Sequence, residues 1–407
     1  MLNRRGGAPC IGGTSMTGLD AVAETDKLCL SGQDSIDDVS RLRSMQGGKE
    51  SQTESPAESS VRYERNLMHV DHYLQRDRRK INLGLNESSY QIPANIKNAA
   101  INALNHLHEY PLGLESKVIE NLSEFYRVDP GCVTITHGLD EALDRMIELF
   151  PNMRYVTFEP TFLGYAARLR LNNVKHKVIR LDEQFAIPEE AWDRIDSSDF
   201  VILANPNNPT GTVFHQAVIE RLHRQCGKLF IDEAYLDYSQ EPTRLDRLDE
   251  KTFVFKSLSK VFALAGQRLG FLFGDHTHIA IVKNRQWFCN TNVLSLEIIQ
   301  AILRDPFMGT HAAMVVYHRE KLRSAALELG FNVRESSTNF ILLRHADSRN
   351  LIKFLDSQGI CAADTAVFGL ENHIRITIGT VAENDILLDA LRRYASKASM
   401  SSISKIA

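Results

Sequence analysis

The sequence predicts an α/β fold, with a large domain around a mainly parallel sheet and a smaller α/β domain in the C-terminal part. The chain has 407 residues, 43% of them hydrophobic and 24% charged, which is enough for two domains around a sizeable core. Short apolar runs rich in β-branched and aromatic residues alternate with segments of helical periodicity. Such alternation is typical of parallel strands joined by helices, and it places the polar ends of the strands at one edge of the sheet.

Charge and composition exclude several classes of function. The formal net charge is -4, so no overall basic field favours nucleic acid as a partner. No apolar run reaches the ~18–20 residues that a membrane helix needs. The six cysteines are scattered, without a CxxC pair and without a histidine at zinc spacing, so we expect no metal site. These cysteines are interpreted as reduced thiols of a cytoplasmic protein.

The first 60 residues differ in composition from the rest and are predicted to be a disordered extension without catalytic residues. Their acidic residues disfavour a transit peptide, and they contain no apolar segment of the kind that a secretory signal needs. The predicted parts of the chain are the extension 1–60, an N-terminal segment 61–108 that contributes to the small domain, the large domain 109–292, the small domain 293–396 and a tail 397–407.

The elements follow in order along the chain. Residues 81–87 form a short strand that runs into a loop, and helices are expected over 93–107 and 115–126, separated by a turn. The strands of the large domain are expected at 132–136, 155–158, 178–181, 200–204, 228–231 and 252–255. A glycine turn after the first of these strands opens a helix over 139–150, a geometry that points backbone N–H groups at an anion.

The small domain is predicted from a second set of patterns. Strands are expected at 340–343 and 374–377, and helices at 313–329 and 386–394. Glu297, Arg319 and Lys321 show the pattern of solvated helix faces, and no function is assigned to them.

A lysine follows the strand 252–255 in an unusual setting. Lys260 ends the run Ser-Leu-Ser-Lys, is followed by five apolar residues, and precedes Arg268 by eight positions. Its amine is expected to be partly desolvated, which favours the neutral, nucleophilic form that makes a Schiff base. Ser257, Ser259 and Arg268 suit the binding of a phosphate. The residues alone leave open the alternative of a loop lysine that closes a strand-to-helix turn.

Two further strand ends carry polar residues. The run Asn-Pro-Asn-Asn-Pro-Thr-Gly at 205–211 restricts the backbone enough to hold an asparagine amide towards a ligand, although it also suits a surface turn. Asp232 ends an apolar strand, where a buried carboxylate is costly unless it meets a cation such as a protonated pyridine nitrogen. The alternative for Asp232 is a helix N-cap. Tyr235, three residues further on, is expected on the same face.

These motifs carry a resemblance to a known family. The asparagine–proline run, then Asp-Glu-Ala-Tyr, then Ser-x-Ser-Lys with an arginine eight residues later, resemble the class I/II aminotransferases of the type I pyridoxal-phosphate fold. The similarity covers about residues 82–394 and is greatest to the histidinol-phosphate aminotransferase branch. It implies an enzyme of amino-acid biosynthesis that moves an amino group between an α-amino acid and a 2-oxo acid through a Lys260 Schiff base.

The resemblance also implies roles for individual residues. Lys260, Asp232 and Tyr235 are the implied catalytic residues, and the cofactor is pyridoxal 5'-phosphate. Residues implied to contact this cofactor are Leu139, Asp140, Phe162, Asn208, Asp232, Tyr235, Ser257, Ser259, Lys260 and Arg268. A family tyrosine before a proline reaches the phosphate of the neighbouring subunit, and Tyr110 matches it, which implies a homodimer.

Substrate recognition is assigned by the same resemblance to Arg375, Asn339 and Tyr90. Arg375 is expected to bind a carboxylate or phosphate in a bidentate manner, the alternative being a strand arginine that faces solvent. The histidinol-phosphate branch carries a second arginine where this sequence has Ala363. The sequence therefore predicts a substrate with a single anionic group, an α-amino acid, in preference to histidinol phosphate.

Three other functions remain open on the sequence. A decarboxylase or an oxygen-using amino-acid oxidase on the same scaffold shares the residues that hold the cofactor. A non-catalytic sensor that binds the cofactor is disfavoured, because Lys260, Asp232 and Arg268 are all present and no helix-turn-helix pattern precedes them.

Overall fold

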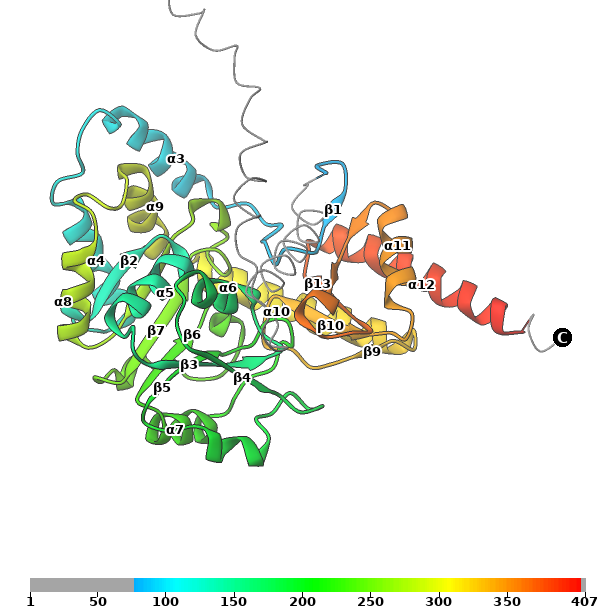
Figure 1. The fold of residues 1–407 in the computed structure, drawn as a ribbon. Coiled ribbons are helices and arrows are strands. Elements are labelled where there is room, and N and C mark those ends of the chain that lie inside the picture. Colours follow the sequence, from blue (N-terminus) through cyan, green and yellow to red (C-terminus); the bar gives the residue numbers. More distant parts are fainter. Residues whose placement is uncertain (1–76, 404–407) are drawn as a thin grey trace, which may run out of the picture. The chain divides into compact units, whose positions relative to one another are not determined.

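The computed structural model describes residues 77–403, and all structural statements below concern this part of the chain (Figure 1). The predictions for the extension 1–60, for the first residues of the segment 61–108 and for the last residues of the tail lie outside it.

The large sheet has seven strands in the order β2-β8-β7-β6-β5-β3-β4 (Figure 1). Its strands are β2 (Val133–Thr136), β3 (Arg154–Glu159), β4 (His176–Arg180), β5 (Asp199–Ala204), β6 (Lys228–Asp232), β7 (Thr252–Ser257) and β8 (Gly270–Phe273). The pairs from β7 to β4 are parallel, and β8 runs antiparallel to both β7 and β2. The six predicted strands of this sheet and its mainly parallel character are confirmed.

Helices cover both faces of this sheet, which explains why its strands are almost continuously apolar. Alternate residues of β5 point to opposite sides: Phe200 packs with α5 (Gly138–Leu149), α6 (Leu163–Leu171) and α8 (His276–Arg285), whereas Val201 packs with α7 (Gln216–Gln225). The polar motifs follow the carboxyl ends of the parallel strands β5, β6 and β7.

The C-terminal part contains a four-stranded sheet in the order β12-β13-β10-β9. Its strands are β9 (Asn332–Val333), β10 (Phe340–Arg344), β12 (Ala363–Asp364) and β13 (His373–Thr377), all paired antiparallel. A separate parallel pair joins β1 (Ile81–Asn82) to β11 (Ile360–Cys361). The remaining helices are α3 (Ala94–Ala103), α4 (Leu114–Tyr126), α9 (Val293–Leu303), α10 (Phe307–Glu328), α11 (Ser348–Ser357) and α12 (Val381–Ile403).

Short 3₁₀ helices complete the elements. They are η1 (Leu104–His106), η2 (Pro130–Cys132), η3 (Glu189–Arg194), η4 (Leu236–Tyr238), η5 (Leu245–Arg247), η6 (Ala265–Gln267) and η7 (Thr365–Phe368). The predicted division into a large and a small domain, with its boundaries, stays a prediction.

One prediction about the surface is wrong. Arg319 on α10 is 6% exposed, and its guanidinium donates to the carbonyl oxygens of Thr338 at 2.9 Å and Tyr238 at 3.2 Å. Helical periodicity identified the helix but not this burial, because both acceptors come from segments distant in sequence. Arg319 thereby ties α10 to η4 and to the segment before β10.

Among residues 77–403, no helix combines the length and apolar character that crossing a membrane requires. The same residues contain no group of three or more histidine, cysteine or acidic side chains that could hold a metal ion. The four cysteines in this part of the chain are unpaired.

Candidate active site

Three adjacent strands, β5, β6 and β7, deliver the polar motifs to one place. Ala204, Asp232 and Phe255 lie side by side at the strand ends. The backbone bonds continue past the ends, since Asn205 N donates to Asp232 O and Glu233 N donates to Phe255 O, each at 2.9 Å. The convergence expected from the alternation of strands and helices is therefore present.

Asp232 is a buried carboxylate at the centre of this edge, 6% exposed. Its Oδ2 accepts a hydrogen bond from the Tyr165 hydroxyl at 2.6 Å, and its Oδ1 accepts from the Ala234 N–H at 2.9 Å. Burial raises the pKa of Asp232 to about 6, against the opposing effects of Tyr165, the Ala234 amide and the Lys260 charge. A carboxylate with so little water around it is suited to a cationic partner.

Lys260 is half-buried and reaches across to the N-terminal segment. Its Nζ donates to the carbonyl oxygen of Asn86 at 3.2 Å and lies 5.6 Å from the centre of the Tyr235 ring. The hydroxyl of Tyr235 accepts from Asn86 Nδ2 at 2.9 Å. Lys260 and Tyr235 are therefore brought together, as predicted, and Asn86 links them.

Asn86 is a residue that the sequence analysis did not assign to the site. It is 1% exposed, has a left-handed backbone with φ of 54°, and exchanges two hydrogen bonds with Thr377 through its N–H and its Oδ1. Its carbonyl oxygen also accepts from Asn339 Nδ2 at 3.1 Å. Its place in the loop after the predicted strand does not reveal contacts to four distant residues, Lys260, Tyr235, Thr377 and Asn339.

Tyr165 is the second residue that sequence reasoning missed. It lies three positions after Phe162, at the start of α6, and its ring makes an edge-on contact with the Phe162 ring at 5.6 Å. Burial raises the pKa of this hydroxyl well above its ordinary range, so it stays a proton donor to Asp232. Phe162 itself is 37% exposed at the N-cap of α6, beside this pair.

The asparagine–proline loop is fixed by its own side chains. Asn207 accepts from the Thr161 hydroxyl at 2.8 Å and donates to the Pro160 carbonyl at 2.9 Å. Asn208, 7% exposed, accepts through its Oδ1 from Arg375 Nη1 at 2.5 Å. The alternative of an exposed surface turn is therefore excluded for this loop.

Arg375 is buried rather than solvent-facing. It is 7% exposed, its Nη2 donates to the Gly84 carbonyl at 2.6 Å, and its guanidinium lies 5.5 Å from the rings of both Phe340 and Phe368. In the register of β12 and β13, Arg375 faces Ala363. Ala363 is 4% exposed, and its methyl group is the side chain opposite Arg375 in this strand pair.

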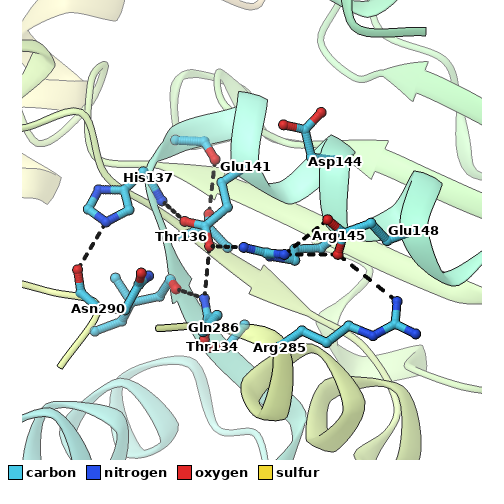
Figure 2. A network of polar contacts seen from close by, with 12 residues as sticks. Thr134, Thr136, His137, Glu141, Asp144, Arg145, Glu148, Arg285, Gln286 and Asn290 are labelled. Atoms are coloured by element: carbon cyan, nitrogen blue, oxygen red, sulfur yellow. Dashed lines mark hydrogen bonds and ion pairs between the residues drawn. The ribbon is translucent and has the colours of Figure 1, made fainter. Parts of the chain in front are cut away.

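Arg268 lies beside the N-terminus of α5. Gly138 has φ of 69°, and a Cβ placed on it would lie 3.6 Å from the Arg268 guanidinium, which brings Arg268 to the helix N-terminus. The His137 N–H is capped by the Glu141 carboxylate at 2.7 Å, within the network drawn in Figure 2. The following N–H groups, including those of Leu139 and Asp140, belong to the first turn, where a helix leaves them without intrahelical partners.

Ser257 is close to this helix N-terminus in the sheet, because Ser257 and Thr136, the last residue of β2, both pair with Gly270 of β8. Ser257 ends β7, and its hydroxyl accepts from the Ser259 N–H at 3.1 Å, which makes a tight turn before Lys260. The shared role of Ser257, Ser259 and Arg268 in binding a phosphate stays a prediction.

Three further predicted residues are Tyr90, Asn339 and Tyr110. Tyr90 is half-buried, and its hydroxyl donates to the Gly379 carbonyl at 3.5 Å. Asn339 is 2% exposed, and its Oδ1 has no hydrogen-bond partner among the described residues. Tyr110 is 74% exposed and contacts Phe288, with ring centres 5.9 Å apart, so a single chain does not bring it to Lys260.

Comparison with known proteins identifies the family. The model of the family "Aminotransferase class I and II" matches residues 78–391. This chain belongs to the class I and II aminotransferases. It is similar to the histidinol-phosphate aminotransferase of Brachyspira hyodysenteriae, with 30% identity over 333 residues that cover 78% of this chain and 93% of that one.

Solved structures agree with this membership. A Burkholderia pseudomallei protein assigned provisionally to the aminotransferases has a TM-score of 0.75 and 36% identity, covering 78% of this chain and 98% of its own. The histidinol-phosphate aminotransferase of Sinorhizobium meliloti, solved with pyridoxal-5'-phosphate, has a TM-score of 0.70 and 18% identity, covering 78% and 91%. The second likeness concerns the fold alone.

The enzyme is thus a pyridoxal-phosphate-dependent aminotransferase of the histidinol-phosphate aminotransferase-like branch. Its own residues fit the cofactor. A lysine amine, a buried carboxylate and a guanidinium at a helix N-terminus supply the three kinds of group that an aldehyde, a pyridine nitrogen and a phosphate need. The unsatisfied Oδ1 of buried Asn339 indicates that the site is built to receive a further polar group.

Proposed function

We propose that the enzyme transfers the amino group of an α-amino acid with one anionic group to a 2-oxo acid, with Lys260 as its catalytic lysine. The observation that carries the substrate class is the pairing of Arg375 with Ala363. Residues opposite each other in an antiparallel pair point to the same face, so a second arginine at position 363 would lie beside Arg375. With alanine there, the pair of β12 and β13 offers one guanidinium at this point, which suits a carboxylate better than the doubly charged phosphate of histidinol phosphate.

The cofactor end of the site divides into three roles. Asp232 holds a protonated pyridine nitrogen, because its buried carboxylate gains a cationic partner there. Asn208 and Tyr235 donate to the 3-oxygen, and Phe162 covers the ring. The phosphate is held by Ser257, Ser259, Arg268 and the first-turn amides of Leu139 and Asp140.

When bound, pyridoxal phosphate supplies a ring that accepts the electron pair released at the substrate Cα. Lys260 then acts as the base: its Nζ, freed by the incoming substrate amine, removes the Cα proton. The Asn86 carbonyl that accepts from Nζ at 3.2 Å, and the Tyr235 ring 5.6 Å away, keep the amine directed into the site.

The substrate is bound by residues that lie on the segments around Asn86. Arg375 binds the carboxylate, and its two terminal nitrogens are already oriented by Asn208 and Gly84. Asn339 offers its unpartnered Oδ1, and Tyr90 closes the side of the site near Gly379.

A homodimer with Tyr110 crossing to the neighbouring site accounts for the exposure of this residue. Phe288, which contacts Tyr110, is 76% exposed, and large apolar side chains close in sequence to these two residues are exposed as well, namely Leu107 at 62%, Leu112 at 70% and Trp287 at 80%. Such a gathering is typical of an interface. The cytoplasmic location stays a prediction from the sequence.

The test is a half-reaction with purified holoenzyme under anaerobic conditions. The visible band of the lysine-bound cofactor is recorded while the enzyme is mixed with a panel of amino acids and with histidinol phosphate. We expect the fastest loss of the band, with release of the matching 2-oxo acid, for an amino acid with a single anionic group. Faster turnover of histidinol phosphate would overturn the substrate class.

Two controls address the remaining parts of the proposal. Lys260→Ala is expected to abolish the visible band, and a persisting band would exclude Lys260 as the attachment point. Consumption of oxygen or release of carbon dioxide in place of transamination would instead indicate an oxidase or a decarboxylase.

A further inference from the structure

A buried histidine connects the loop of the catalytic lysine to the loop that carries Tyr90. His311 lies in the second turn of α10 and is 1% exposed. Its Nδ1 contacts the carbonyl oxygen of Val261, the residue after Lys260, at 2.7 Å. Its Nε2 contacts the hydroxyl of Ser88 at 3.0 Å. One imidazole therefore contacts two loops that are far apart in the chain, since the strands β2 to β7 lie between them in sequence.

The partners of the imidazole fix its tautomer. A carbonyl oxygen can only accept, so Nδ1 carries a hydrogen and donates it to Val261. Burial lowers the pKa of His311 below its ordinary value, so the ring is neutral near pH 7 and Nε2 is an acceptor. The Ser88 hydroxyl therefore donates to Nε2 at 3.0 Å, which is nearer than its other acceptor, the Tyr90 carbonyl at 3.3 Å. The Ser88 oxygen in turn accepts from the Tyr90 N–H at 3.1 Å.

The imidazole is also held on its faces and edges. Phe307 stacks on it with ring centres 5.0 Å apart and planes 9° apart. The ionisable side chains whose rings face it are Tyr90, at 5.7 Å between centres, and Tyr238, at 6.4 Å. Because these contacts fix the ring, its Nε2 has a defined position relative to the lysine loop, and so does the Ser88 hydroxyl that bonds to it.

Residues 83–93, which we call the Ser88 loop, form neither helix nor strand. The loop therefore depends on contacts with other segments to hold its position. Backbone bonds hold Leu83 to Cys361 and Thr377, whereas Gly84, Asn86, Ser88 and Tyr90 are held by bonds that involve a side chain. At one end the Asn86 carbonyl accepts hydrogen bonds from both Lys260 and Asn339. At the other end the N–H of Tyr90 donates to the Ser88 hydroxyl. The bond from Ser88 to His311 is thus the anchor between these two ends.

We propose that His311 is a positioning residue for substrate binding, which holds the Ser88–Tyr90 loop over the lysine loop through its neutral Nε2. The proposal rests on the proposed function for the identity of the site, and it deepens that function by naming what orients the substrate side. His311 does not touch the reacting atoms. Its loss is expected to raise KM for the amino acid roughly tenfold, the effect of one lost hydrogen bond on loop order, with a much smaller change in kcat.

Two substitutions separate the two bonds of the ring. In His311→Asn the amide reaches the position of Nδ1 and keeps the donor to Val261, but nothing replaces Nε2. In His311→Gln the longer side chain reaches the position of Nε2 and keeps an acceptor for Ser88. We expect the asparagine variant to raise KM as Ser88→Ala does, and the glutamine variant to restore most of the affinity.

A matched control is available in the large sheet. His176 is likewise shielded, with its pKa lowered to about 4 by burial, and its Nε2 contacts the Thr157 hydroxyl at 2.8 Å. His176→Asn removes an equivalent bond far from the Ser88 loop, so it is expected to lose comparable stability without a change in KM. A KM that rises equally in both asparagine variants would overturn the proposal, since the effect would then be general loosening.

Hydrogen exchange provides a readout that does not depend on turnover. Peptides covering residues 86–92 are expected to exchange faster in His311→Asn and Ser88→Ala than in the parent protein, and unchanged in His176→Asn. Unchanged exchange in the first two variants would refute the anchor. If the parent protein failed to transaminate any substrate, the proposed function would fail, while the exchange data would still decide the role of His311.

Discussion

The guanidinium of Arg375 donates to the side-chain oxygen of Asn208 at 2.5 Å, although 167 positions separate the two residues. Its other terminal nitrogen donates to the Gly84 carbonyl at 2.6 Å. The residue proposed to bind the substrate anion is therefore oriented by one that is proposed to bind the cofactor. Both acceptors are neutral oxygens, so they fix the planar guanidinium without supplying a negative charge to it.

Replacing Arg375 by lysine is expected to lower kcat/KM for the amino-acid substrate roughly 10- to 100-fold, mainly through KM. Lysine keeps the positive charge, but it cannot form two parallel hydrogen bonds to a carboxylate while also bonding Asn208 and Gly84. Steady-state kinetics of the parent enzyme, of Arg375→Lys and of the control variant Arg344→Lys with the preferred amino acid measures the effect.

Arg344→Lys is the matched control for this substitution. Arg344 ends β10, the neighbouring strand of the same sheet, and is exposed. Equal loss of kcat/KM in both variants would contradict a specific role for Arg375.

Asp232 is expected to lower the stability of the cofactor-free protein at neutral and alkaline pH. Burial raises its pKa from 3.8 to about 6, so the folded state holds the proton more tightly than the unfolded chain does. The stability that this group contributes is therefore present below about pH 4 and is lost as the pH rises through about 6. Asp232→Asn removes this loss and is expected to gain up to about 3 kcal/mol over the parent apoprotein at pH 8.

Thermal unfolding of both apoproteins between pH 4 and pH 8 measures the difference. The gain should grow with pH, and addition of pyridoxal phosphate should stabilise the parent more than the variant, because only the carboxylate meets the pyridinium charge. A difference that is constant with pH would show that the Asp232 carboxyl does not titrate in this range.

Local patterns were sufficient to predict the strands that carry the site. Each of β5, β6 and β7 is a short apolar run followed at once by unusual polar residues, and this pattern depends only on neighbours in sequence. Parallel strands then bring their carboxyl ends together whatever the loops do. The positions of Asp232, Tyr235 and Lys260 at one edge could therefore be predicted before any contact was known.

The features that were missed depend on distant partners. The strand β8 has four apolar residues directly after the Arg268 turn, too few for a periodic signal, and it exists because β2 and β7 pair with it on both sides. Asn86 and Arg319 look like ordinary polar residues in a loop and on a helix. Their burial depends on partners outside any local pattern, such as Tyr235 at 149 positions from Asn86, and Tyr238 and Thr338 at 81 and 19 positions from Arg319.

Charging the exposed aromatic surface is expected to break the proposed dimer. Phe288 is 76% exposed and contacts the ring of Tyr110. In Phe288→Asp, association would desolvate a carboxylate without a partner, which is costly in an apolar interface. The mass in solution should therefore shift from dimer to monomer, as measured by light scattering during gel filtration.

Tyr317→Asp serves as the control for this surface. Tyr317 is 65% exposed on α10, outside the group around Tyr110, so its replacement should leave the mass unchanged. A monomeric parent protein would contradict the dimer and the crossing of Tyr110.

A buried ion pair links the ends of β6 and β7. Lys256 Nζ lies 3.0 Å from the Glu233 carboxylate and 3.9 Å from Asp237, and the side chains of Lys256 and Glu233 are 5% and 2% exposed. Burial by itself lowers the pKa of Lys256, but the two carboxylates more than offset this effect, so the pKa lies above its ordinary value. Lys256 precedes Ser257, and Glu233 follows Asp232, so the pair joins the two segments that carry the catalytic groups.

Breaking this pair on one side is expected to be far more harmful than removing it. Lys256→Met leaves the Glu233 charge buried without its cation, which typically lowers the free energy of unfolding by about 3–5 kcal/mol. Adding Glu233→Gln removes that charge, and its amide can still accept from the Arg244 N–H, which now donates to the carboxylate at 2.8 Å. The double variant should therefore recover much of the lost stability in denaturant titrations. If the double variant were as unstable as the sum of the single ones, the two side chains would be acting independently, and the pair could not be what holds β6 and β7 in place.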